Sequence, residues 1–188
     1  TSGAARPGST SMFSGILIDP PWPERGSGKV KRGADRHYPL IKTKEEILRV
    51  IVTADCWTPA DDCHLYLWST NNYLPWAMWL MPALGFKYKT CLPWVKSGRL
   101  GLGQYFRGCH EMLLFGVRGK GYAVKTDATI RSDVLCGLPR PKKDGKFVHS
   151  AKPEEVYGLV ELRTEGPYLE MFARKSRDGW TSWGNEVP

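Results

Sequence analysis

The stretch GILIDPPW, residues 15–22, is the strongest fold signal in the chain. Its apolar run, Gly15 to Ile18, has the length and composition of a buried β-strand. The two prolines that follow cannot donate hydrogen bonds to a sheet, so the strand must end before them. Asp19 is therefore predicted to lie at the carboxyl tip of a buried strand.

Helix and strand patterns alternate along the rest of the chain. Thr43 and Glu46 form a capping box, and apolar residues then recur at helical spacing. This alternation predicts an α/β fold with a mostly parallel sheet flanked by helices, whose ligands bind beyond the carboxyl ends of the strands. The predicted elements after the first strand are a helix over 43–56, a strand over 64–68, a helix over 75–84, strands over 86–96 and 112–117, a helix over 153–162 and a strand over 168–173.

Three long segments carry no periodic pattern. Residues 23–39 are rich in Gly, Lys, Arg and Pro, and residues 98–108 are rich in glycine. Long loops inside compact domains are often functional, so both are predicted to be lids over a site. Residues 120–148 are basic and are predicted to be irregular.

Size and composition limit the class of protein. The 188 residues, 41% of them hydrophobic, suit one domain, predicted over 13–188, after a tail over 1–12 that is disordered or an expression remnant. No apolar run of about 18 residues and no signal-peptide pattern is present, which predicts a soluble protein of the cytoplasm, or of the host cytoplasm for a phage protein. The five cysteines lack CxxC spacing, so reduced thiols and no metal are expected.

The charge balance points to a polyanionic partner. The chain has 27 Lys and Arg against 19 Asp and Glu, a formal net charge of +8. Basic surfaces bind phosphates and release their counterions. A generally solvated basic surface explains the same numbers, so charge alone names no substrate.

The residues Asp19-Pro20-Pro21-Trp22 suit chemistry on an adenine amine, whose lone pair is delocalised into the ring. The Asp19 carboxylate and the Pro20 carbonyl can each accept one amino hydrogen and aim the lone pair at a methyl carbon, while the prolines fix the backbone. Trp22 can stack on a base that is flipped out or single-stranded. The alternative is a strand-ending turn with Trp22 as a core aromatic.

From about Gly15 to Val187 the chain resembles the MT-A70 family, the DPPW-bearing adenine-N6 methyltransferases of messenger RNA and of bacterial and phage DNA. The resemblance implies a Rossmann-like methyltransferase in which the DPPW half precedes the cofactor-binding half, with S-adenosylmethionine as the methyl donor. The matching blocks are DPPW at 19–22, HYPL at 37–40, LWSTN at 67–71, GFKYKTCLPWVKSG at 85–98, GLGQYFRGCHE at 101–111, HSAKPEEVYGLVE at 149–161, LEMFAR at 169–174 and GWTSWGNE at 179–186.

The resemblance also implies roles for single residues. Lys152 would hold the cofactor carboxylate, although a solvated loop lysine is the alternative. The other implied cofactor residues are Asp19, Arg174, Ser176, Asn185 and Glu186, of which Glu186 can accept both ribose hydroxyls. Where the messenger-RNA enzyme has histidine and asparagine after this arginine, Ser176 and Arg177 stand here.

Residues for the base and the backbone complete the expected site. Tyr38, Trp94, Lys96 and Glu111 match positions that shape the base pocket, although both aromatics could be core residues and Lys96 only a strand-end charge. Candidates for contact with the nucleic-acid backbone are Tyr105 and Arg107 with Arg99, Lys29, Lys31 and Arg32.

The sequence thus predicts methyl transfer from S-adenosylmethionine to adenine, in DNA rather than RNA because the compact chain resembles bacterial and phage members. RNA stays an alternative, and so does a catalytically silent nucleic-acid-binding partner. Transfer to cytosine or to a protein fits the same chemistry less well. A homodimer or a partner subunit is left open, because a chain of this size offers little surface for reading a duplex.

Overall fold

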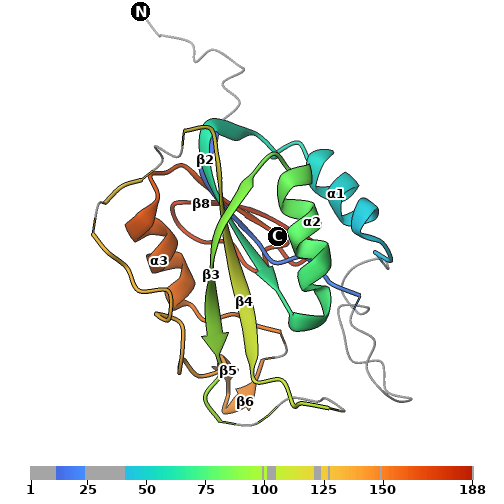
Figure 1. The fold of residues 1–188 in the computed structure, drawn as a ribbon, viewed down its shortest axis with the longest axis vertical. Coiled ribbons are helices and arrows are strands. Elements are labelled where there is room, and N and C mark those ends of the chain that lie inside the picture. The colour runs from blue at the N-terminus through green and yellow to red at the C-terminus, as the bar shows by residue number, and fades with distance from the viewer. Residues whose placement is uncertain are drawn as a thin grey trace, which may run out of the picture.

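A six-stranded sheet with the strand order β3-β4-β2-β1-β7-β8 forms the centre of the computed structural model (Figure 1). The structure describes residues 12–23, 41–98, 100, 105–120, 124–126, 128–148 and 150–187. The elements are β1 (Phe13–Ile18), α1 (Lys44–Val52), β2 (Pro59–Ser69), a 3₁₀ turn η2 (Asn71–Tyr73), α2 (Leu74–Ala83), β3 (Lys87–Val95), β4 (His110–Arg118), β5 (Lys142–Lys143), β6 (Lys146–Phe147), α3 (Glu155–Arg163), β7 (Tyr168–Met171) and β8 (Trp180–Trp183).

Strand β1 is the switch point of the sheet. It pairs in parallel with β2 on one side and with β7 on the other, and β7 pairs in parallel with β8. Only β4 runs against its neighbours β2 and β3. The predicted mostly parallel α/β sheet is confirmed, and Asp19 follows β1 where the strand order reverses, which is where open α/β sheets bind ligands.

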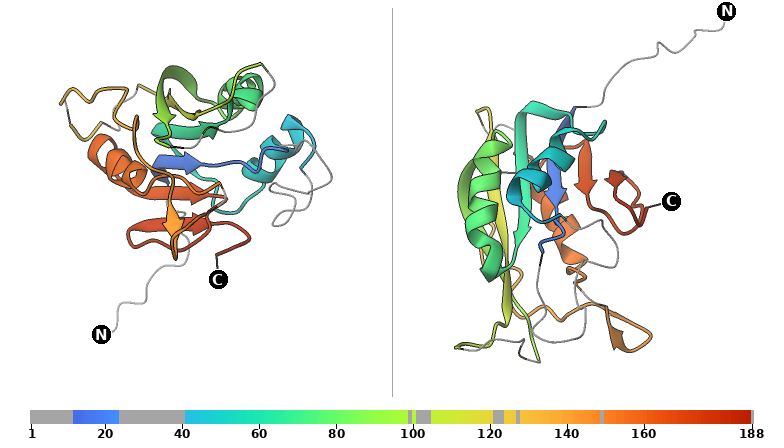
Figure 2. Two further views of the ribbon diagram at one scale, coloured as in Figure 1. Left: turned by 90° about the horizontal axis from the view of Figure 1, so that it is seen from below. Right: turned by 90° about the vertical axis from the view of Figure 1, so that its right-hand side faces the viewer.

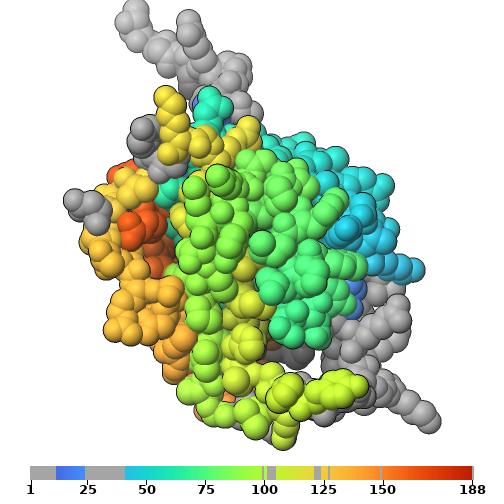
Figure 3. Space-filling model, in the orientation of Figure 1, coloured from blue at the N-terminus to red at the C-terminus, as the bar shows by residue number. Residues whose placement is uncertain are grey.

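The sheet separates two cores, because side chains alternate between its faces. Ile16 and Ile18 of β1 pack with Ile47 and Ile51 of α1 on one face. Leu17 packs on the other face with residues of α3. Figure 2 shows α1 and α2 on one side of the sheet and α3 on the other, and Figure 3 shows α1 and α2 beside β3 on the surface. Both faces are therefore covered, as a parallel sheet requires.

Several boundaries differ from the predicted ones. The first helix ends at Val52 rather than near Cys56, because the Thr53 hydroxyl donates to the Arg49 carbonyl at 2.7 Å and closes the last turn. The Thr43 cap is confirmed, with the Glu46 N–H donating to the Thr43 hydroxyl at 3.2 Å, whereas the Glu46 carboxylate accepts from the Lys42 N–H at 2.6 Å rather than from Thr43. The structure adds β8 and the β5–β6 hairpin to the predicted elements. No helix within the described ranges is long and apolar enough to cross a membrane.

Thr164, at the end of α3, ties the two halves of the chain together through a fully buried hydroxyl. Its oxygen lies 2.8 Å from Nδ1 of His64 and 2.7 Å from the hydroxyl of Tyr66, both on β2. A buried polar group that loses its partner costs about 1–3 kcal/mol. This hydroxyl therefore fixes α3 against the middle of the sheet.

A Thr164→Val variant is expected to lower the free energy of unfolding by about 2–3 kcal/mol, since it leaves buried groups on His64 and Tyr66 without this partner. The melting temperature should fall by about 4–12 °C, which calorimetry measures. Thr164→Ser keeps the hydroxyl and is the control. A Val variant that melts at the same temperature as the wild-type chain would show that the hydroxyl contributes nothing.

Candidate functional site

Four side chains of alternating charge form a row at the carboxyl edge of β1. Nζ of Lys152 lies 2.7 Å from Oδ2 of Asp19 and 3.4 Å from Oε2 of Glu111. Glu111 also pairs with Lys96. Asp19 follows β1, Lys96 follows β3, Glu111 lies on β4 and Lys152 precedes α3. The structure thus brings together predicted residues that are far apart in the sequence, and we call Asp19, Lys152, Glu111 and Lys96 the charge row.

Burial and the neighbouring charges act against each other on the pKa of each acid in this row. Burial raises the pKa of Asp19, and the ammonium of Lys152 offsets this only in part. Burial alone would also raise the pKa of Glu111, but Lys152 and Lys96 outweigh it and the net shift is downward. Burial would lower the pKa of Lys152, whereas Asp19 and Glu111 raise it above the usual value. Glu111 and Lys152 are therefore ionised at neutral pH.

Trp22 is a core residue, which corrects the expectation that it stacks on the substrate base. Its side chain is 5% exposed, and its Nε1 donates to the Trp68 carbonyl at 3.1 Å. Its ring is stacked on Tyr73, with ring centroids 5.7 Å apart and planes 9° apart. A ring that is 5% exposed and has both a hydrogen bond and a stacking partner in the core offers little surface to a base. Trp22 instead fixes the turn after Asp19.

Trp94 is also buried, at 1% exposure, and its Nε1 donates to the Leu138 carbonyl at 3.0 Å. The structure therefore supports its alternative interpretation as a core aromatic. The Trp94 ring packs edge to face against the Trp68 ring, with the ring centroids 6.0 Å apart. Lys96 lies over Trp94 and Lys152 over Trp68, at 4.8 and 5.6 Å from the ring centroids. The two tryptophans thus form an aromatic floor under the cations of the charge row. Trp68, in the LWSTN block, was not among the predicted site residues.

Four of the predicted cofactor residues, Arg174, Ser176, Asn185 and Glu186, lie after β7 and β8. Nε of Arg174 is 4.0 Å from Oε1 of Glu186. A Cβ added to Gly184 would come within 2.3 Å of the Ala173 carbonyl, so the 184–186 turn presses against the end of β7. The charge of Arg174 also acts on Asp19 and Lys152. The exposed Asn185 and Ser176 are near Glu186 and Arg174 in the sequence. Together with the Arg174 guanidinium and the Glu186 carboxylate, they fit the ribose and amino-acid portions of the expected cofactor.

The loop after Arg174 is tied to the start of α3 by contacts that the sequence did not predict. Lys175 lies 2.8 Å from Glu154, and Arg177 pairs with the same carboxylate. The guanidinium of Arg177 also lies 3.6 Å from the centroid of the Tyr157 ring. Arg177 therefore braces the loop that carries Ser176. Glu154, in the HSAKPEEVYGLVE block, was the only sequence signal for this brace.

The predicted backbone contacts are described only in part. Tyr105 is 92% exposed, and Arg107 is exposed with a guanidinium nitrogen 3.4 Å from the Leu100 carbonyl. Both positions suit contact with a large ligand and stay predictions. The remaining candidates, Tyr38, Arg99, Lys29, Lys31 and Arg32, lie outside the described residues. So does the predicted lid over 23–39, apart from its first residue.

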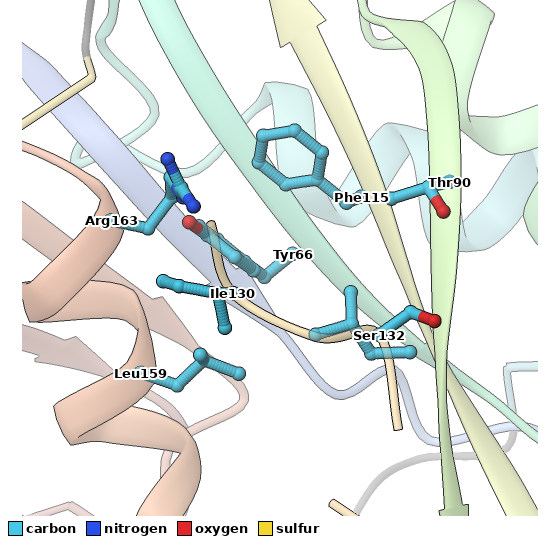
Figure 4. A pocket seen from close by; sticks show the side chains of 8 residues that line it. Tyr66, Thr90, Phe115, Ile130, Ser132, Leu159 and Arg163 are labelled. Carbon is cyan, nitrogen blue, oxygen red and sulfur yellow. The ribbon is translucent and has the colours of Figure 1, made fainter. Parts of the chain in front are cut away.

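A separate pocket of about 230 Å³ opens on the α3 face of the sheet (Figure 4). Tyr66, Phe115 and Leu159 are among its apolar lining residues, and Arg163 also lines it. Arg163 donates to the carbonyls of Thr126 and Ala128 at 2.8 and 2.7 Å. None of the lining residues belongs to the charge row, so this pocket is not where the predicted chemistry would occur. The described residues place no three His, Cys, Asp or Glu side chains together as a metal site.

Comparison with known proteins gives a match along almost the whole chain. The family model described as MT-A70 matches residues 13–186. This range contains the charge row and the loops after β7 and β8.

This chain is similar in sequence to three named methyltransferases. The Type II methyltransferase M.MunI of Mycoplasma is 28% identical, over 92% of this chain and 77% of its own length. Human N(6)-adenine-specific methyltransferase METTL4 is 31% identical, over 93% of this chain but 37% of its own. The N6-methyladenosine RNA methyltransferase MTA1 of Cryphonectria parasitica is 29% identical, over 94% of this chain and 52% of its own. This chain thus spans about a third to a half of the two longer relatives.

Proposed function

The chain belongs to the MT-A70 family, and from this premise we propose that it transfers a methyl group from S-adenosylmethionine to the exocyclic amine of adenine in a nucleic acid. The observation that carries the proposal is the Asp19 carboxylate, fixed at the switch point of the sheet by Lys152 at 2.7 Å. The named relatives METTL4 and MTA1 are methyltransferases of adenine or adenosine.

The turn after β1 supplies two acceptors for the amino hydrogens. Lys152 contacts Oδ2 of Asp19, so we assign Oδ1 to the amine. The Pro20 carbonyl accepts the Trp22 N–H at 2.8 Å, which fixes its direction and leaves its second lone pair for the other amino hydrogen. Two fixed acceptors draw the amine nitrogen out of the base plane and aim its lone pair at the methyl carbon. The resulting gain in rate comes from positioning.

The rest of the site holds the donor and removes the proton. When bound, S-adenosylmethionine supplies an electrophilic methyl group on a positively charged sulfur. We assign its ribose to Glu186 and Asn185 and its amino-acid portion to Arg174 and Ser176, which lie after β7 and β8. As the new N–C bond formed, the methyl–sulfur bond would break and S-adenosylhomocysteine would leave as a neutral thioether. The amine must then lose one proton, and we assign the Asp19 carboxylate as the base, because burial raises its pKa.

We propose DNA as the substrate, with RNA as the alternative. The chain matches the compact M.MunI over 77% of that protein's length, and the RNA methyltransferase MTA1 over only 52%. The test incubates the protein with methyl-labelled S-adenosylmethionine and with matched single-stranded DNA, duplex DNA or RNA, followed by nucleoside mass spectrometry. N6-methyladenine in a DNA pool supports the proposal. Label in RNA alone would show that RNA, not DNA, is the substrate. Absence of label from every pool would contradict the proposed reaction.

The pH dependence of kcat/KM should reveal the protonation of the Asp19 carboxylate. The ionised carboxylate accepts an amino hydrogen more strongly than the protonated acid does, and only the ionised form can take up the released proton. Burial raises the pKa of Asp19 above the ordinary 3.8. Activity is therefore expected to fall as the pH drops through this raised pKa, with no matching loss near pH 9, because Lys152 stays protonated. A profile that stays flat down to pH 4 would contradict this role. Cofactor binding measured at each pH separates loss of binding from loss of chemistry.

A further inference from the structure

The β5–β6 hairpin is a small element whose shape is set by its own sequence. Asp144 and Gly145 both have positive φ angles, 50° and 74°, as the two central residues of a type I′ turn do. The turn pairs Lys143 with Lys146 and Lys142 with Phe147. Figure 1 shows the hairpin beyond the carboxyl end of β3, and Figure 2 shows it projecting from the body.

The hairpin concentrates positive charge that the described part of the chain does not neutralise. Its four cations, Arg140, Lys142, Lys143 and Lys146, face one acid, Asp144, in the turn. None of the four has an ion-pair partner among the described residues. Lys143 and Lys146 are directly opposite each other on one face, and like charges in this position repel. An anion bound between them would relieve this repulsion.

The other face of the hairpin presents an aromatic ring between cations. Phe147 is 47% exposed. Arg140 and Lys142 lie over its ring, at 4.8 and 4.9 Å from the centroid. An exposed aromatic side chain combined with a row of cations is the arrangement by which proteins hold the bases and phosphates of nucleic-acid strands. The two faces thus suit one polyanionic ligand with planar groups.

The hairpin is also held close to the charge row. Phe147 lies five positions before Lys152, which contacts Asp19. An extended chain of that length spans at most about 18 Å. At about 3.4 Å per nucleotide along one strand of a duplex, a backbone on the hairpin would lie within about five nucleotides of a base at Asp19.

We infer that the β5–β6 hairpin binds the sugar–phosphate backbone of the substrate nucleic acid beside the target adenine, with Lys143 and Lys146 on phosphates. The inference rests on the proposed function for the identity of the ligand. It assigns a role to part of the basic segment 120–148, which was predicted to be irregular.

The test uses the double variant Lys143→Gln/Lys146→Gln. Its matched control is Lys87→Gln/Lys89→Gln, which removes the same charge from two exposed lysines at the far end of β3. Binding to a fluorescent 12-nucleotide DNA, single-stranded and duplex, is measured by anisotropy at several salt concentrations. The hairpin variant should bind about tenfold more weakly at 0.1 M salt. The slope of log K against log salt should fall by about 1.4–1.8, since each lost phosphate contact removes about 0.7–0.9.

The outcomes separate this inference from the proposed function. Equal loss of affinity in the hairpin variant and the control would mean that only total charge matters, and would overturn the inference. Unchanged binding in the hairpin variant would overturn it too, even if the wild-type chain methylates adenine. Lys143→Arg/Lys146→Arg keeps the charge and should bind like wild type. A wild-type chain that binds through the hairpin and transfers no methyl group would refute the proposed reaction but not the hairpin contact.

Discussion

An Asp19→Asn variant is expected to methylate adenine about a hundredfold to a thousandfold more slowly than the wild-type chain, while it binds S-adenosylmethionine almost normally. The amide has the size of the carboxylate but carries no charge, so it accepts the amino hydrogen weakly and takes up no proton. Loss of one fixed group that acts on the transition state typically costs this much in kcat. Single-turnover transfer from labelled cofactor measures the rate, and calorimetry measures cofactor binding.

The control for this variant is Asp133→Asn, which removes an acid that pairs with Arg131 on the exposed surface. It should keep full activity. If Asp19→Asn stays within tenfold of wild type, the carboxylate does not orient the amine. If the variant loses cofactor affinity and activity by the same factor, Asp19 belongs to the cofactor site instead.

A Lys152→Met variant should lose both activity and stability. Methionine has about the same length but no charge, so Asp19 and Glu111 would be left as two buried acids without their shared cation. Breaking a fully buried ion pair by removing one partner costs about 3–5 kcal/mol, and a smaller loss is expected here because the Lys152–Asp19 pair is part-buried. We expect kcat to fall about a hundredfold, because Asp19 loses the contact that fixes Oδ2. Kinetics at saturating cofactor and chemical denaturation measure the two effects.

The same variant decides between two roles for Lys152. The resemblance implies that Lys152 holds the cofactor carboxylate, whereas the structure directs its ammonium to Asp19, Glu111 and the Ser150 carbonyl. A positioning role predicts a fall in kcat with a less than tenfold rise in the cofactor Kd. A large rise in Kd with unchanged kcat would restore the cofactor role. Lys175→Met, at an exposed pair with Glu154, is the control and should change stability by less than about 1 kcal/mol.

The sequence predicted the parts of the fold that depend on local patterns. The apolar run before Asp19 indicated β1, and the capping box at Thr43 indicated α1. The hairpin was missed because lysines are rare in strands, although Asp144-Gly145 was a usable turn signal. Strand β8 was missed because four residues at a sheet edge carry too little pattern. The antiparallel direction of β4 depends on long-range pairing, which no local pattern encodes.

The sequence predicted which residues belong to the candidate site better than it predicted the contacts between them. The motifs named Asp19, Lys152, Glu111 and Lys96, and the structure brings these four together. No motif could predict which way the Trp22 side chain points, because the DPPW sequence is the same whether the Trp22 ring faces the core or the ligand. The structure places it in the core.

The position of β1 between β2 and β7 has a consequence for how the protein folds. The pairing of Gly15 with Tyr168 joins residues 153 positions apart. Such distant pairings slow folding, since a long loop must close before the contact contributes any stability. During synthesis one edge of β1 stays uncovered until β7 has emerged from the ribosome. The same strand order that creates the crevice at Asp19 thus means that the crevice forms only after β7 has paired with β1.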